Sequence, residues 1–158
     1  MYVRLATSAD VPHIVRIFYE TIHYVNVSDY TPEQIHAWAP DLPDPALWEK
    51  RLDTRMTFVA DAGGAVLAFG ELHRSGLIDC LYCHHEHQRC GIGSFVLRVM
   101  TLTAISLGQS RLSTASSITA RPFFKAHGFI TVKSQTVVRH NIALPNFIME
   151  KTVSIKRP

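Results

Sequence analysis

The middle of the chain, residues 77–116, is the segment that most limits the fold. "LIDCLYCH" (77–84) is typical of a strand, and so is "RLSTAS" (111–116). Between them, residues 91–107 carry apolar side chains at helical spacing and end at a Leu-Gly pair that is typical of a helix C-terminus. A helix between two strands is a β-α-β crossover. The chain is therefore expected to have one such unit at its centre.

Further strands are predicted on both sides of this unit. Residues 56–62 and 65–74, joined by Gly63-Gly64, predict a β-hairpin that leads into the strand at 77–84. At the other end, residues 130–140 and 146–153 predict two final strands. Most neighbouring strands are consecutive in the chain, so the sheet is expected to be mostly antiparallel.

Helices are predicted in the remaining segments. A strand at 2–7 precedes helices at 9–24, 29–38 and 44–54, and a short helix at 119–129 is stopped by a glycine. The second of these helices carries a threonine cap, a proline at its first position and a glutamine three residues after the cap. The expected fold is mixed α/β, with a mostly antiparallel central sheet flanked by helices, in one domain over 1–158.

Composition narrows the class of protein. Of the 158 residues, 47% are apolar and 18% are charged, which is globular rather than disordered. The net charge of +3 comes from scattered basic residues, which does not match the clustered basic face of a nucleic-acid binder. It is compatible with a phosphate-bearing ligand. We expect no nucleic-acid partner, and a homodimer stays possible.

The sequence carries no obvious export or membrane signal. No basic segment followed by an apolar run opens the chain, and no apolar run approaches the 18 or so residues of a membrane span. Three closely spaced cysteines do not resemble a disulfide framework. We expect a cytoplasmic protein without a membrane partner.

The stretch "CLYCHHEHQRC" suggests a metal or haem site. Its cysteines and histidines include the spelling C-x-x-C-H: Cys80, Cys83, His84, His85, His87 and Cys90. Because side chains of a strand alternate between faces, the first two cysteines should point apart, and the first two histidines should also diverge. A C-x-x-C zinc knuckle needs a tight turn and a second ligand pair, and covalent haem attachment belongs to exported proteins. We therefore expect no metal and two small core cysteines, with a zinc-binding domain as an alternative.

The same stretch runs into a glycine-rich turn at a helix start. Gly91 and Gly93 let backbone N–H groups approach an anion, and the helix N-terminus adds the positive end of its dipole. Gln88, Arg89 and Ser94 can add donors. The turn matches neither the dinucleotide fingerprint nor the Walker loop. It predicts a phosphate or pyrophosphate site, and a plain loop-to-helix junction is the alternative.

This turn resembles the acyl-CoA-binding motif of the GNAT N-acetyltransferase superfamily, Q/R-x-x-G-x-G/A after a strand. Gln88, Gly91 and Gly93 match the motif. The resemblance extends over the chain, and "DYTPEQIHAWAP" is similar to a bacterial subgroup. It implies an enzyme that transfers an acetyl group from acetyl-CoA, its co-substrate, to a primary amine of a small molecule or peptide. The amine would attack directly in a ternary complex.

The resemblance also implies residue roles. The pantetheine arm would pair with the strand edge, and a strand-end bulge would leave an N–H near Tyr82 or Cys83 free to polarise the thioester carbonyl. The pyrophosphate would lie on the turn. The implied acetyl-CoA residues are Leu81, Tyr82, Cys83, Gln88, Arg89, Cys90, Gly91, Ile92, Gly93, Ser94, Ser117 and Phe124.

One departure from the family concerns catalysis. The family pattern N-x-x-A-x-x-x-Y corresponds here to Ser117-x-x-Ala120-x-x-x-Phe124, so the usual tyrosine acid is absent. Tyr82 or water could replace it as the proton donor. The absence also leaves a second hypothesis open, namely a non-catalytic acyl-CoA-binding sensor or regulatory domain on the same fold.

The general base and the acceptor pocket are less well defined. Asp79 and Glu71 are candidate bases, since a direct attack needs a neutral amine. A solvated charge at a strand end is an equal interpretation of Glu71. By resemblance, Tyr30 and Trp38 belong to the helical segment that covers the acceptor pocket. Neither identifies the acceptor.

Overall fold

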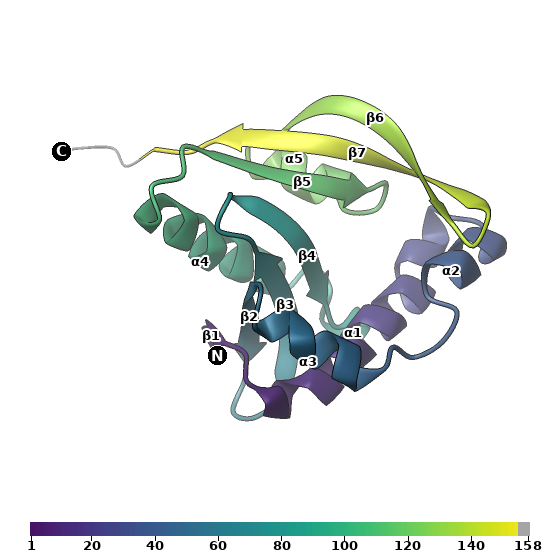
Figure 1. Cartoon of the computed structure of the whole chain (residues 1–158), viewed down its shortest axis with the longest axis horizontal. Helices are drawn as coiled ribbons and strands as arrows, with labels where there is room; N and C mark the ends of the chain where they lie inside the picture. Colours follow the sequence, from purple (N-terminus) through teal and green to yellow (C-terminus); the bar gives the residue numbers. More distant parts are fainter. Residues whose placement is uncertain (155–158) are drawn as a thin grey trace.

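The computed structural model describes residues 1–154 and contains a seven-stranded sheet in the order β1-β2-β3-β4-β5-β7-β6 (Figure 1). All neighbouring strands are antiparallel except β4 and β5, which are parallel. The predicted mixed α/β class, with its central β-α-β unit, is confirmed. The strands are β1 Tyr2–Leu5, β2 Met56–Asp61, β3 Val66–Leu72, β4 Leu77–Cys83, β5 Arg111–Ser117, β6 Ile130–Arg139 and β7 Ile142–Thr152.

The helices cover both faces of the sheet. Residues of α4 and α5 share one apolar cluster with β2, β3, β5 and β7, while α1 and α3 share another with the opposite face of β2, β3 and β4. None of the described helices is long and apolar enough to cross a membrane. The helices are α1 Val11–Tyr24, α2 Pro32–Trp38, α3 Pro45–Leu52, α4 Ile92–Ser106 and α5 Arg121–Ala126, with short 3-10 turns η1 Ser8–Asp10, η2 Asn26–Ser28 and η3 His85–His87.

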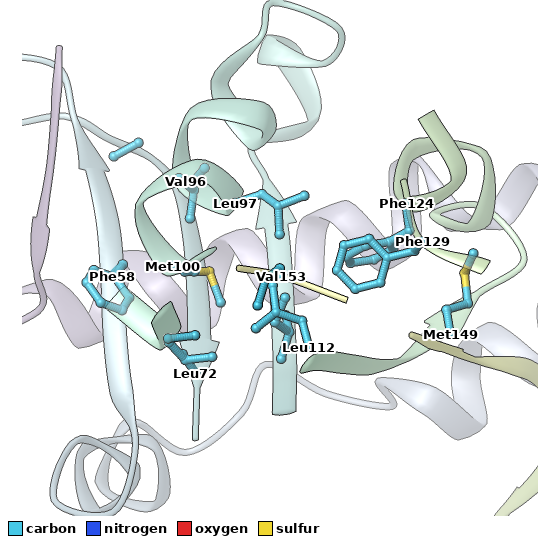
Figure 2. Close-up of a cluster of buried hydrophobic side chains, with 14 of the residues drawn as sticks. Phe58, Leu72, Val96, Leu97, Met100, Leu112, Phe124, Phe129, Met149 and Val153 are labelled. Atoms are coloured by element: carbon cyan, nitrogen blue, oxygen red, sulfur yellow. The ribbon is translucent and has the colours of Figure 1, made fainter. Parts of the chain in front are cut away.

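The α4 side of the core depends on close packing between the helix and the sheet. Figure 2 shows Val96, Leu97 and Met100 of α4 pointing toward the sheet. A Cβ on Gly70 of β3 would lie 2.5 Å from the Met100 sulfur. The missing side chain at Gly70 therefore lets α4 lie close against the sheet, which fixes the position of the helix N-terminus.

The β4 strand separates from β5 after only two paired positions. Leu77 pairs with Ser113 and Ile78 with Thr114, and no later pair joins the two strands. On its other edge, the register with β3 shifts so that Asp79 has no partner residue. Such a bulge bends a strand and increases its twist. The bulge was expected near Tyr82 or Cys83 but lies three or four residues earlier, where the two strands part (Figure 1).

The last hairpin is longer than predicted. β7 begins at Ile142 rather than at 146, after a two-residue turn in which His140 and Asn141 have φ of 47° and 63°. The longer strand includes Pro145, which cannot donate to a ladder. Here it occupies a non-hydrogen-bonded position opposite β6 and lies beyond Asn146, the last residue that pairs with β5. Its missing N–H therefore costs no sheet hydrogen bond.

Candidate active site

The separation of β4 and β5 opens a cleft of about 800 Å³. A volume of this size suits a cofactor or a drug-sized ligand. Thr114 closes the narrow end, where its hydroxyl donates to the Ile78 carbonyl at 3.0 Å. Of the residues expected to bind acetyl-CoA, all except Cys90 line the cleft: Leu81, Tyr82, Cys83, Gln88, Arg89, Gly91, Ile92, Gly93, Ser94, Ser117 and Phe124.

The free edge of β4 presents backbone groups to the cleft. The His84 N–H donates to the Leu67 carbonyl at 2.8 Å, which sets the alternation of the β3–β4 ladder. By that alternation, Tyr82 bonds to β3 while Leu81 and Cys83 direct their N–H and C=O groups toward the cleft. The Cys83 carbonyl accepts the Thr21 hydroxyl at 2.8 Å and the Gln88 amide at 2.7 Å. The free N–H groups of this edge therefore belong to Leu81 and Cys83, and not to Tyr82.

The glycine turn begins α4 as predicted. Gly91 is the N-cap residue with φ of 80°, a left-handed conformation that favours glycine, and it has open space where a Cβ would stand. The first N–H groups of a helix have no partner within it, so they can bind an anion. Arg89, two residues before Gly91, also has positive φ, and Arg89 and Gly91 both line the cleft.

The thiols near the cleft are poor nucleophiles. Burial raises the pKa of Cys83 to about 11 and raises that of Cys80 as well, so both remain protonated at neutral pH. The third thiol, Cys90, is exposed and does not line the cleft. These environments agree with the expectation of two core cysteines. A Cβ on Gly93 would lie 3.1 Å from the Cys83 sulfur, so the thiol and the turn are packed against each other.

A serine–histidine pair lies at the start of α4. The His127 Nδ1 is 2.8 Å from the Phe123 carbonyl, which can only accept, so this nitrogen carries the proton. When the ring is neutral, its Nε2 is then the acceptor for the Ser94 hydroxyl, 2.9 Å away. The sequence analysis did not identify His127. No local signal marks it, because 33 residues separate the two partners.

The two candidate carboxylate bases belong to one charged cluster. Glu71 is 1% exposed and forms two hydrogen bonds with Arg51, one of 2.9 Å. Asp79 lies 3.1 Å from Arg55, 3.2 Å from Arg51 and 3.7 Å from His73. Asp79 lines the cleft and Glu71 does not. Asp79 is therefore the carboxylate that a bound molecule can reach.

The Tyr82 side chain lies among aromatic rings. Its ring packs 5.2 Å from Phe18 and 5.6 Å from Phe69, measured between centroids. Burial raises the pKa of its phenol. The phenol is therefore protonated at neutral pH and is not a base there.

Ser117 ends β5 and Phe124 lies in α5, and both line the cleft. Ser117 accepts the Ala120 N–H at 3.0 Å and so fixes the turn into the helix. Phe124 is 3% exposed and packs 5.1 Å from Phe129, and it borders the cleft. The position where the resemblance places a tyrosine hydroxyl is thus filled by an apolar ring.

The helical segment that contains Tyr30 and Trp38 contributes to one wall of the cleft. Trp38 lines the cleft, but Tyr30 does not. The Tyr30 hydroxyl donates to the Pro145 carbonyl at 2.8 Å and accepts the Ile118 N–H at 2.9 Å, which joins the segment to β7. Asn26, from the same segment, also lines the cleft, and lining residues that the sequence did not suggest include Thr21, Val25, His87, Thr119 and Phe123.

Comparison with known proteins identifies the family. The model of the acetyltransferase (GNAT) domain matches residues 26–152. The chain belongs to the GNAT acetyltransferase family. A GNAT relative, the uncharacterized N-acetyltransferase YafP of Escherichia coli, is 31% identical over 141 residues, which cover 89% of this chain and 88% of the relative. The predicted GNAT membership and the acetyltransferase class are thereby confirmed.

Solved GNAT structures agree with this assignment. A GCN5-related N-acetyltransferase from Rhodopseudomonas palustris superposes with a TM-score of 0.91 at 27% identity, covering 96% of this chain and 94% of that one. The PaiA N-acetyltransferase from Thermoplasma acidophilum, solved in complex with coenzyme A, has the same fold, with a TM-score of 0.79, 16% identity and coverage of 96% and 98%.

Proposed function

We propose that the protein transfers the acetyl group of acetyl-CoA to a primary amine of a small molecule or peptide, by direct attack in a ternary complex. The observation that carries the proposal is the cleft between β4 and β5, which leads from a free strand edge to the glycine turn of α4. A strand edge can pair with an amide-bearing arm, and a helix N-terminus can bind a diphosphate. Acetyl-CoA contains both groups in that order.

The cleft also offers a buried polar group that has no hydrogen-bond partner in the described part of the chain. The Thr119 hydroxyl lines the cleft and is buried without a hydrogen-bond partner. Buried polar groups usually have a partner, so a bound molecule is a reasonable one. We place the pantetheine arm along Leu81 and Cys83. One of their N–H groups would polarise the thioester carbonyl, and the diphosphate would lie on the turn at residues 88–94.

The proposed reaction forms a C–N bond and breaks the thioester C–S bond. Asp79 accepts the proton of the attacking amine, directly or through water. The CoA sulfur leaves as a thiolate, which is tolerable because a free thiol has a pKa of about 8.5. It then takes a proton from water, because burial raises the pKa of the Tyr82 phenol above that of the thiol. Phe124 has no proton to give, so no acid is assigned to that position.

The competing hypothesis is an acyl-CoA sensor on the same fold, favoured by Phe124 in place of a tyrosine. The two are separated by measuring CoA thiol release from acetyl-CoA with a panel of amines and peptides. We expect amine-dependent release above the rate of hydrolysis for at least one class of acceptor. Tight acetyl-CoA binding without release for every acceptor would support the sensor instead.

A further inference from the structure

Glu20, His84 and His85 gather at the end of β4, outside the residues that line the cleft. One ligand atom of each lies within 4.8 Å of the others, and His85 Nδ1 is 3.5 Å from a Glu20 carboxylate oxygen. Strand alternation had predicted that the two imidazoles diverge. That prediction is wrong because β4 ends at Cys83, and the rings instead stack at 4.7 Å with 19° between their planes.

In the described part of the chain, one ring nitrogen of this cluster makes no hydrogen bond, and neighbouring side chains contact the cluster. The His85 Nδ1 is buried and makes no hydrogen bond among the described residues, since the Glu20 oxygen at 3.5 Å is an ion-pair contact only. The His85 ring stacks on Tyr24, with 4.6 Å between centroids, and Arg16 binds a Glu20 oxygen at 2.7 Å. A buried ring nitrogen that makes no hydrogen bond calls for an explanation, and a bound ion is one.

The groups match the ligands that zinc prefers. Zinc binds imidazole nitrogen and carboxylate oxygen at about 2.0–2.2 Å, which places two tetrahedral ligands roughly 3.4 Å apart. The separation of 3.5 Å between His85 and Glu20 is already close to that value. Two imidazoles and a carboxylate leave a fourth position for water. We propose that Glu20, His84 and His85 form a zinc site that joins α1 to the loop before the glycine turn.

Metal binding at this site would break one existing hydrogen bond. The Glu86 N–H donates to His84 Nδ1 at 3.2 Å. If the metal takes that nitrogen, the amide loses its acceptor. If the metal takes the other nitrogen, Nδ1 becomes protonated and again cannot accept. The amide signal of Glu86 in NMR spectra should therefore move when zinc is added.

The first test is calorimetric titration of the untagged, EDTA-stripped protein with Zn²⁺. We expect one zinc per chain with micromolar or tighter affinity, and a rise in Tm with added zinc, since a ligand that binds the folded state stabilises it. Glu20→Gln and His85→Phe should each weaken the affinity at least tenfold while leaving the zinc-free Tm unchanged. His13→Ala, at an exposed histidine of α1, should bind as the parent does.

A second measurement distinguishes this site from binding by thiols. Co²⁺ bound to imidazole and carboxylate gives visible bands without the near-ultraviolet charge-transfer band of a thiolate ligand. Loss of binding in Cys90→Ser together with a thiolate band would overturn the proposal. So would the absence of saturable zinc binding, or equal affinity in the parent, Glu20→Gln and His85→Phe. Acetyl transfer is not part of either measurement, so the proposed function is tested separately.

Discussion

At the scale of single residues, the packing of Gly93 against the Cys83 thiol connects the turn of α4 to β4. A Cβ on Gly93 would lie 3.1 Å from that sulfur, which is tighter than ordinary contact, and 3.5 Å from the Phe123 ring, which is an ordinary contact. We predict that Gly93→Ala lowers the free energy of unfolding by about 1 kcal/mol through overpacking. Urea denaturation of the variant checks this.

The matched control is the double variant Gly93→Ala with Cys83→Ala. Removing the sulfur frees the space that the new methyl group needs, so the double variant should lose less stability than the sum of the two single changes. Strictly additive losses would contradict the contact. Amine-dependent turnover should persist in Cys83→Ala, because the proposed reaction uses the backbone and not the thiol.

The two candidate bases, Asp79 and Glu71, also differ at the scale of single residues. Asp79 lines the cleft, whereas Glu71 is 1% exposed and bound to Arg51. We predict that Asp79→Asn lowers kcat by about a hundredfold or more, the usual contribution of a general base. A folded Asp79→Asn protein with the parental kcat would remove Asp79 from the mechanism.

At the scale of elements, the Arg51–Glu71 ion pair joins α3 to β3. Removing one partner of a buried pair leaves an uncompensated charge, at a cost of several kcal/mol. We predict that Arg51→Met lowers the free energy of unfolding by about 3 kcal/mol, with Arg55 at 3.7 Å from Glu71 as the remaining cation. Chemical denaturation measures the loss.

An exposed ion pair provides the comparison. Arg16 pairs with Glu20 on the surface of α1, and its side chain is 72% exposed. Because such pairs contribute little, Arg16→Met should leave the free energy of unfolding nearly unchanged. Similar losses in the two variants would show that burial of Glu71 does not set the cost of losing Arg51.

Local signals predicted most elements, and they failed where distant segments decide the geometry. The Thr31–Gln34 capping box is present, since each side chain bonds to the backbone of the other residue. The bulge at Asp79 depends on the register with β3, and the His127–Ser94 contact joins two different helical segments. Neither leaves a periodicity or a spacing that a single sequence can display.

At the scale of the whole molecule, Arg4 of β1 joins the η1 turn to the end of β2. It binds Asp10 at 2.7 and 2.9 Å and Asp61 at 2.9 Å. Hydrogen bonds from Arg4 lower the pKa of Asp10 to about 2, from a usual value of 3.8. A lowered folded-state pKa stabilises the protein above the unfolded value, and this stabilisation is lost as the pH falls through the folded value.

Asp10→Asn should therefore be less stable than the parent by about 2 kcal/mol at neutral pH. The difference should shrink between about pH 4 and pH 2, where the parent carboxylate gains its proton. Urea denaturation of both proteins across this range measures it. A difference that does not depend on pH would mean that packing, and not charge, explains the effect.

The proposed function depends on the place where the only parallel strand pair of the described sheet separates. Because β4 and β5 part after two residues, the sheet gains a cleft and the helix that follows β4 points its N-terminus at it. The sequence predicted the turn, and the fold supplies the space beside it. The account requires the diphosphate of acetyl-CoA to lie against Gly91.

Calorimetric titration of acetyl-CoA into Gly91→Asp and Gly108→Asp tests this requirement. Gly91 has φ of 80° and Gly108 has φ of 83°, and both have open space where a Cβ would stand. They lie at opposite ends of α4. Both variants should suffer the same backbone strain. We predict that only Gly91→Asp weakens binding, by at least about 2 kcal/mol, because its carboxylate repels the diphosphate. Parental affinity in a folded Gly91→Asp protein would contradict the account.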